Sequence, residues 1–100
     1  MSENLILAQI ELFTTSAKVN MAAHNICIRK GAVIRHEIQK VQNEINQAIS
    51  SDAQMTGEQW SKEAELMEQY KLLQFEADDL LAEAEHDIRR AKALRDTLNS

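Results

Sequence analysis

Proline is absent from this chain, and glycine occurs only at Gly31 and Gly57 among 100 residues. A domain of this length ordinarily contains about five prolines and seven glycines. Both residues destabilise the interior of a helix, proline most strongly. The sequence can therefore sustain helices much longer than the three or four turns that are common in globular proteins.

A polar, turn-like cluster at residues 50–57 separates two long stretches that have helical periodicity. This pattern predicts an all-α fold: a long antiparallel helical hairpin, coiled-coil-like, in a single domain over residues 1–100. The predicted helices cover about 3–50 and about 57–98, with a turn at about 51–56. A lone two-helix hairpin of this length leaves apolar flanks in water, so we expect it to dimerise into a four-helix bundle.

Both stretches contain a seam with the alternating three- and four-residue spacing of a coiled coil. In the first stretch the seam consists of Ile6, Ile10, Phe13, Ala17, Asn20, His24, Cys27, Gly31, Ile34, Ile38, Val41, Ile45 and Ala48. In the second it consists of Leu66, Tyr70, Leu73, Ala77, Leu80, Ala84, Asp87, Ala91, Leu94 and Leu98. Because the first seam keeps its phase across Gly31, we predict one continuous helix there. The alternative is three helices with a break near Gly31.

Residues typical of a helix start precede both stretches. Ser2 is a candidate N-cap, and Glu3 is placed favourably against the helix dipole. Thr56, followed three residues later by Gln59, resembles a capping box. These signals predict that the helices begin close to residues 3 and 57.

Three polar residues occupy seam positions that are otherwise apolar: Asn20, His24 and Asp87. A hairpin folded at about residues 53–54 places Asn20 opposite Asp87, with His24 one helical turn away. Because an unpaired polar group is costly in a helical core, we interpret them as a polar core layer that fixes the register. The alternatives are exposure to solvent near the open end of the hairpin, and a ligand or metal site.

Glu83 and His86 have the Glu-x-x-His spacing that di-iron carboxylate bundles use. They flank the seam rather than lying on it, and the facing stretch offers His24 and no glutamate. The ligand set is incomplete, so we predict no metal site. The sequence also lacks a nucleophile–base set, a phosphate-binding glycine loop and zinc-type cysteine spacing. We therefore predict no catalytic residue, no cofactor and no enzyme activity.

The net charge is −5, and the negative charge is concentrated in the second half of the chain. This balance argues against nucleic acid as a partner. Across the predicted hairpin, basic residues of the first helix fall opposite acidic residues of the second: Arg29, Lys30, Arg35 and Lys40, and Glu68, Glu76 and Asp78. We expect this match of charge to favour the predicted register over a shifted one.

The apolar run from Leu5 to Phe13 is interrupted by Gln9 and Glu11, and no basic segment precedes it. We therefore expect neither a signal peptide nor a membrane span, and no membrane partner. The single cysteine, Cys27, lies on the seam, where a small buried hydrophobic residue is the usual interpretation. These observations predict a cytoplasmic protein.

The first part of the first helix has more apolar side chains than one seam requires. Apolar columns run along both flanks of that seam, and we predict that they form an interaction surface: Leu5, Leu12, Val19, Met21, Ile26, Ile28 and Val33. Burying each large side chain fully is worth about 1.5–3 kcal/mol, enough in sum to drive association.

The predicted function is that of a non-enzymatic, self-associating helical interaction module, such as an adaptor or a small chaperone-like protein. Its predicted partners are a second copy of itself, as a homodimer, and another protein bound through those apolar flanks. One alternative is a purely structural subunit whose only partner is itself. The other is a metal-binding helical bundle.

Overall fold

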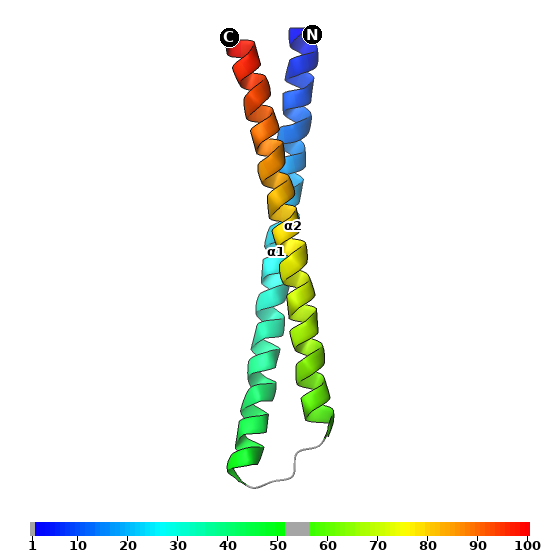
Figure 1. Cartoon of the computed structure of the whole chain (residues 1–100), viewed down its shortest axis with the longest axis vertical. Helices are drawn as coiled ribbons and strands as arrows, with labels where there is room; N and C mark the ends of the chain where they lie inside the picture. The colour runs from blue at the N-terminus through cyan, green and yellow to red at the C-terminus, as the bar shows by residue number, and fades with distance from the viewer. Residues whose placement is uncertain (1, 52–56) are drawn as a thin grey trace. The chain divides into compact units, whose positions relative to one another are not determined.

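Two helices make up the computed structural model, which describes residues 2–51 and 57–100. Helix α1 runs over Glu3–Ser50 and helix α2 over Gly57–Asn99, and they pack against each other as an antiparallel hairpin (Figure 1). The described residues contain no strand. The predicted all-α helical hairpin is therefore confirmed.

The start of α1 is capped as predicted. The Oγ atom of Ser2 accepts a hydrogen bond from the backbone amide of Leu5 at 3.3 Å, which satisfies one of the free amides of the first turn. Beyond Ser51, the predicted turn lies outside the described residues. Thr56, the first residue of the predicted capping box, lies outside them too.

Helix α1 is continuous through Gly31, so the three-helix alternative with a break there is wrong. A glycine inside a helix costs about 1 kcal/mol relative to alanine. Gly31 is buried in the seam, next to the ring of Tyr70. Packing along the seam on both sides of the glycine keeps the helix intact.

Contacts divide the hairpin into two units, and each contains a segment of both helices. The first unit consists of Met1–Ile26 and Glu76–Ser100, and the second of Cys27–Phe75. That the whole chain is a single domain stays a prediction. The two units are described separately below.

In the first unit the two ends of the chain lie side by side, as Figure 1 shows. Ile6, Ile10 and Ala91 form a buried cluster there. Three partly buried residues pack against it: Phe13, Leu94 and Leu98. The ring of Phe13 also lies 5.4 Å from the guanidinium carbon of Arg90, within the range of a cation–π interaction.

The side of α2 that faces α1 in this unit is lined by small residues. Its buried residues are all alanines, and they recur every seven positions: Ala77, Ala84 and Ala91. Ala17 is the matching buried alanine on α1. Because methyl groups take little space, two helices that meet along such a column approach closely.

In the second unit the core consists of Cys27, Val41 and Ile45, which are all nearly fully buried. Cys27 is a free thiol within this core and takes the place of a small hydrophobic side chain, as predicted.

The predicted match of charge across the hairpin does not form ion pairs. Within residues 2–51 and 57–100, the one ion pair within 4.0 Å joins Lys40 to Glu37, and both residues belong to α1. The basic residues that were expected to reach α2 are exposed: Arg29, Lys30, Arg35 and Lys40. Because exposed charges are screened by water, we expect their contribution to the register to be small.

We predict that Gly31→Ala stabilises the protein. A Cβ atom added at Gly31 would lie 3.5 Å from Cε2 of Tyr70, an ordinary van der Waals distance. The full helix-propensity gain of about 1 kcal/mol should therefore appear in the free energy of unfolding in urea. Gly31→Leu is the matched control, because leucine is also a good helix former but must displace Tyr70. A loss of stability with alanine would contradict this account of the seam.

We predict that Ala84→Leu destabilises the hairpin by about 1–3 kcal/mol, because a larger side chain forces the two helices apart. Ala84 has no exposed surface. Ala82→Leu, on the exposed side of the same helix, should leave the free energy of unfolding nearly unchanged. Equal effects of the two substitutions in urea unfolding would show that the alanine column does not set the distance between the helices.

Candidate functional site

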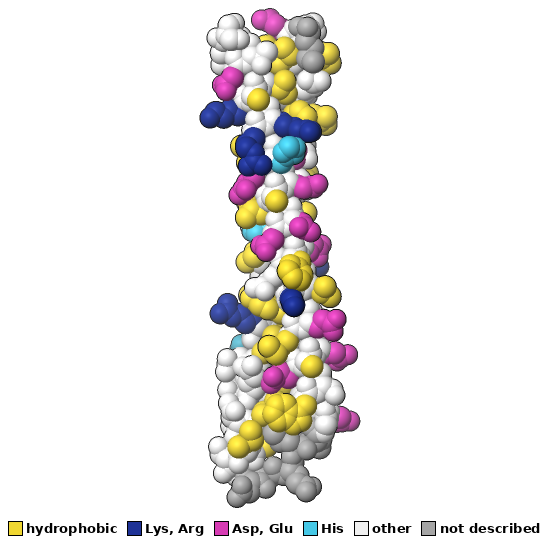
Figure 2. All heavy atoms as spheres, viewed as in Figure 1, with side chains coloured by type: hydrophobic (Ala, Val, Ile, Leu, Met, Phe, Trp, Pro, Cys, Tyr) yellow, Lys and Arg dark blue, Asp and Glu magenta, His cyan; other side chains and the backbone are white. Residues whose placement is uncertain are grey.

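The hairpin leaves many large hydrophobic side chains in contact with water. In the described residues none of the large side chains is completely buried. Large hydrophobic residues that are exposed lie on both helices: Leu5, Leu7, Leu12, Val19, Ile26, Ile28, Val33 and Ile49 on α1, and Trp60, Met67, Leu72, Phe75 and Ile88 on α2. Hydrophobic side chains also lie at the surface among charged ones in Figure 2. Large apolar side chains exposed in such numbers make these helix faces candidates for an interaction surface.

One column of these residues runs along α1 in the first unit. We call it the outer column: Leu5, Leu12, Val19 and Ile26. Residues seven apart lie on the same face of a helix, about 10.5 Å from one another along its axis. Each member precedes a seam residue and is therefore rotated about 100° away from the seam. The exposed fractions, from 46% at Ile26 to 66% at Leu12, show that α2 does not cover this column.

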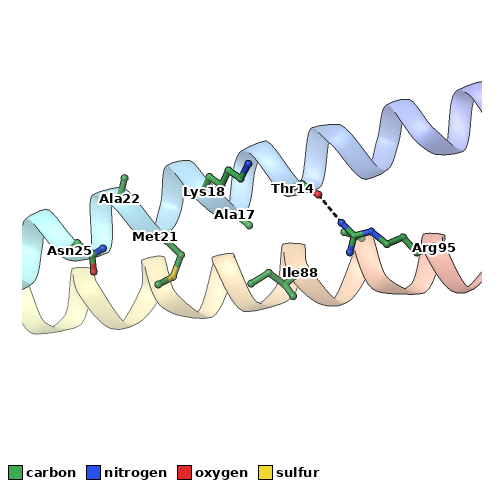
Figure 3. Close-up of a pocket in the computed structure, with 9 residues that line it drawn as sticks. Thr14, Ala17, Lys18, Met21, Ala22, Asn25, Ile88 and Arg95 are labelled. Atoms are coloured by element: carbon green, nitrogen blue, oxygen red, sulfur yellow. Dashed lines mark hydrogen bonds between the residues drawn. The ribbon is translucent and has the colours of Figure 1, made fainter.

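A groove lies on the other flank of α1 in the same unit, and we call it the α1/α2 groove. It has a volume of about 440 Å³, and Figure 3 shows the side chains that line it: Thr14, Ala17, Lys18, Met21, Ala22 and Asn25 from α1, and Ile88, Ala91 and Arg95 from α2. Met21 points from α1 toward α2, and Ile88 is the large apolar side chain that α2 contributes to the groove. One end is crossed by a hydrogen bond from Arg95 Nη2 to Thr14 Oγ1, at 3.3 Å.

The predicted interaction residues fall into three groups. Four form the exposed outer column just described. Met21 is half-buried and lines the α1/α2 groove. Ile28 and Val33 belong to the second unit, where both are exposed.

Ile88 of α2, which is 52% exposed, was missing from the predicted surface. Its signal was present in the sequence as an apolar column beside the second seam: Trp60, Met67, Leu81 and Ile88. The predicted interaction surface was confined to the first helix because apolar residues are denser there than in the second helix.

The predicted polar layer is formed in part. Oδ2 of Asp87 accepts a hydrogen bond from Asn20 Nδ2 at 3.4 Å, so these two residues meet as expected. The same carboxylate oxygen accepts a shorter bond from Ser16 Oγ, at 2.6 Å. Ser16 was not predicted, although it lies one turn before Asn20 on the same face. All three side chains are partly buried.

His24 makes a different contact from the one expected. Its Nδ1 atom lies 2.8 Å from the backbone carbonyl oxygen of Ala77. Since a carbonyl oxygen only accepts, Nδ1 carries the hydrogen and donates it. The contact is possible because the alanine side chain leaves the α2 backbone accessible from α1. His24 therefore ties the helices together through the backbone, and not through Asp87.

Three further findings bear on function. No cluster of three or more His, Cys, Asp or Glu residues suited to a metal ion occurs in the described part of the chain. Over the same residues, neither helix has a stretch that is both long and apolar enough to cross a membrane. No protein-family model, curated protein or solved structure matches this sequence.

We predict strong coupling between Ser16 and Asp87. A hydrogen bond of 2.6 Å to a carboxylate is short and charge-assisted. Ser16→Ala and Asp87→Ala should each lower the free energy of unfolding, and a double-mutant cycle should give a coupling energy of about 1–2 kcal/mol. Ser16→Ala combined with Asp79→Ala is the control, and we expect it to show additive effects. Additivity in the Ser16–Asp87 cycle would mean that the bond contributes nothing to stability.

Proposed function

We propose that this chain is a non-enzymatic, self-associating helical interaction module that binds another protein through the apolar flanks of α1. The observation that carries the proposal is the outer column, whose side chains are about half exposed or more. An exposed helix face with apolar residues at regular spacing is what a helical partner packs against. The module then acts as an adaptor or a small chaperone-like protein.

The alanine-lined seam supports self-association. Alanine buries little surface, so the seam of the first unit draws on few of the large hydrophobic residues of either helix. Packing of two hairpins into a four-helix bundle gives those residues a place to be buried. The proposed assembly is a homodimer with coiled-coil packing.

The proposed setting is the cytoplasm, and the proposed partners are proteins rather than nucleic acid or membrane. The free, buried thiol of Cys27 is suited to a reducing compartment. The net charge of −5 disfavours binding to a polyanion.

Two measurements test the proposal. Light scattering should give twice the chain mass of 11.4 kDa at micromolar concentration, together with a helical circular dichroism spectrum. A pull-down from the native source should recover a stoichiometric partner protein. A mass of one chain would contradict self-association. A dimer that recovers no partner would favour the alternative of a purely structural subunit.

The variant Leu12→Asp with Val19→Asp should split the oligomer or release the partner protein. Both side chains are more than 60% exposed, so the charges cost little in the isolated hairpin and much in an interface. Circular dichroism should show that appreciable helix remains. Unchanged mass and unchanged partner binding would place the interface elsewhere on the chain.

A further inference from the structure

We infer that the second copy docks on the α1/α2 groove of the first unit, with the contact centred near Thr14 and Ile88, toward the end of the groove that Arg95 crosses. The inference rests on the self-association proposed above and assigns it to one face. It leaves the outer column free for a different protein. Two observations carry it: the apolar floor of the groove, and the pattern of charges along its two rims.

The floor of the groove is apolar and built from both helices. Met21 and Ile88 contribute the large side chains, and Ala17 and Ala91 also line the groove. The bond from Arg95 to Thr14 neutralises no charge, but it holds the arginine side chain across one end of the groove. A second apolar surface laid on this floor would remove Met21 and Ile88 from water.

The same charge pattern occurs on both rims of the groove. On α1, Glu11 lies three residues before Thr14, and Lys18 lies four residues after it. On α2, Glu85 lies three residues before Ile88, and Lys92 lies four residues after it. Residues three and four apart share a helix face, so these charges flank the groove. All four are exposed.

The register places these charges in two rows. Ser16 and Asn20 both bond to Asp87, so residue 18 lies level with about residue 87. Lys18 is therefore within about 3 Å of the level of Glu85, and Glu11 is equally close to the level of Lys92. Each row across the groove has one acidic and one basic residue.

This arrangement is complementary to a second copy of itself. If the two-fold axis runs along the helices, Lys18 faces Glu85 of the second copy, and Glu11 faces its Lys92. If the axis is perpendicular to the helices, Glu11 faces Lys18 of the second copy, and Glu85 faces its Lys92. Neither arrangement brings like charges together, as an isologous interface requires.

The residues seven positions beyond these four charges add no like-charged contact between the two copies. Seven residues beyond the charges lie Asn4 and Asn25 on α1, and Asp78 and Asn99 on α2. Asp78 meets an asparagine of the second copy in either arrangement, so no repulsion is added at the ends. A surface evolved for an unrelated protein has no need of such a symmetric pattern.

The outer column is not flanked on α1 by acidic and basic residues in this alternating pattern. At the offsets compared above, three before and four after, the neighbours of Leu12 and Val19 on α1 are uncharged: Gln9, Ser16 and Ala23. Arg29 and Lys30, which follow Ile26 by three and four positions, are both basic. On α1 the outer column therefore lacks the alternation of acidic and basic residues that makes the groove complementary to a second copy.

The first test compares Ile88→Asp with Val19→Asp by sedimentation equilibrium of the full chain. The two side chains are similarly exposed, at 52% and 62%, so the variants are matched in the isolated hairpin. Ile88→Asp should raise the dimer dissociation constant at least about 100-fold. Val19→Asp should leave that constant within about twofold of the unchanged protein. Circular dichroism of both variants checks that the helices persist.

The second test reverses charges and does not depend on the apolar floor. Glu85→Lys should weaken the dimer about tenfold by creating like-charged contacts. Adding Lys18→Glu should restore the dimer if α1 packs on α2 of the second copy. Adding Lys92→Glu should restore it instead if α2 packs on α2.

The outcomes separate the inference from the proposed function. The groove is supported as the dimer interface if Ile88→Asp disrupts the dimer and Val19→Asp does not, and if either Lys18→Glu or Lys92→Glu restores the dimer that Glu85→Lys weakens. Loss in Val19→Asp alone, or rescue by neither swap, overturns the groove while self-association stands. A monomeric unchanged protein overturns self-association itself.

Discussion

The alanine column of α2 is the feature on which the rest of the first unit depends. Ala77, Ala84 and Ala91 bring the two helices close enough for His24 to reach the backbone of α2. Their small size also limits how much apolar surface the seam can bury, at about 25 cal/mol per Å². The large hydrophobic residues beside the seam are therefore left exposed. Close packing inside the hairpin thus leaves apolar surface that the proposed self-association would bury.

The regular spacing of both seams and the absence of proline were sufficient to predict the hairpin from the sequence. The meeting of Asn20 and Asp87 was predictable too, since any hairpin folded near its midpoint brings them level. Two details of the structure were not predictable from the sequence. The bond from His24 to Ala77 uses a backbone acceptor, which no side-chain pattern reveals. Within the part of the chain that the structure describes, the exposed basic residues of α1 form no ion pair with α2, because positions outside the seam leave long side chains in water.

The candidate surface was predictable only in part. The outer column stands out in the sequence, since its four members repeat every seven residues beside a seam that is already complete. The α1/α2 groove does not, because it needs both helices and the level at which they meet. Met21 and Ile88 are far apart in sequence, and only their packing shows that they line one groove. A pattern on a single helix cannot reveal a surface that two helices build together.

The alanine column specifies the register only weakly, because its members recur every seven residues and a slip of seven residues presents alanines to α1 again. The bonds of Ser16 and Asn20 to Asp87 distinguish these alternatives. After a slip in one direction, Lys18 would lie near the level of Lys92, and after a slip in the other, Glu11 would lie near that of Glu85. Each slip would bring like charges together along the groove. The polar contact in the seam and the charge pattern that we infer a second copy recognises therefore belong to the same register.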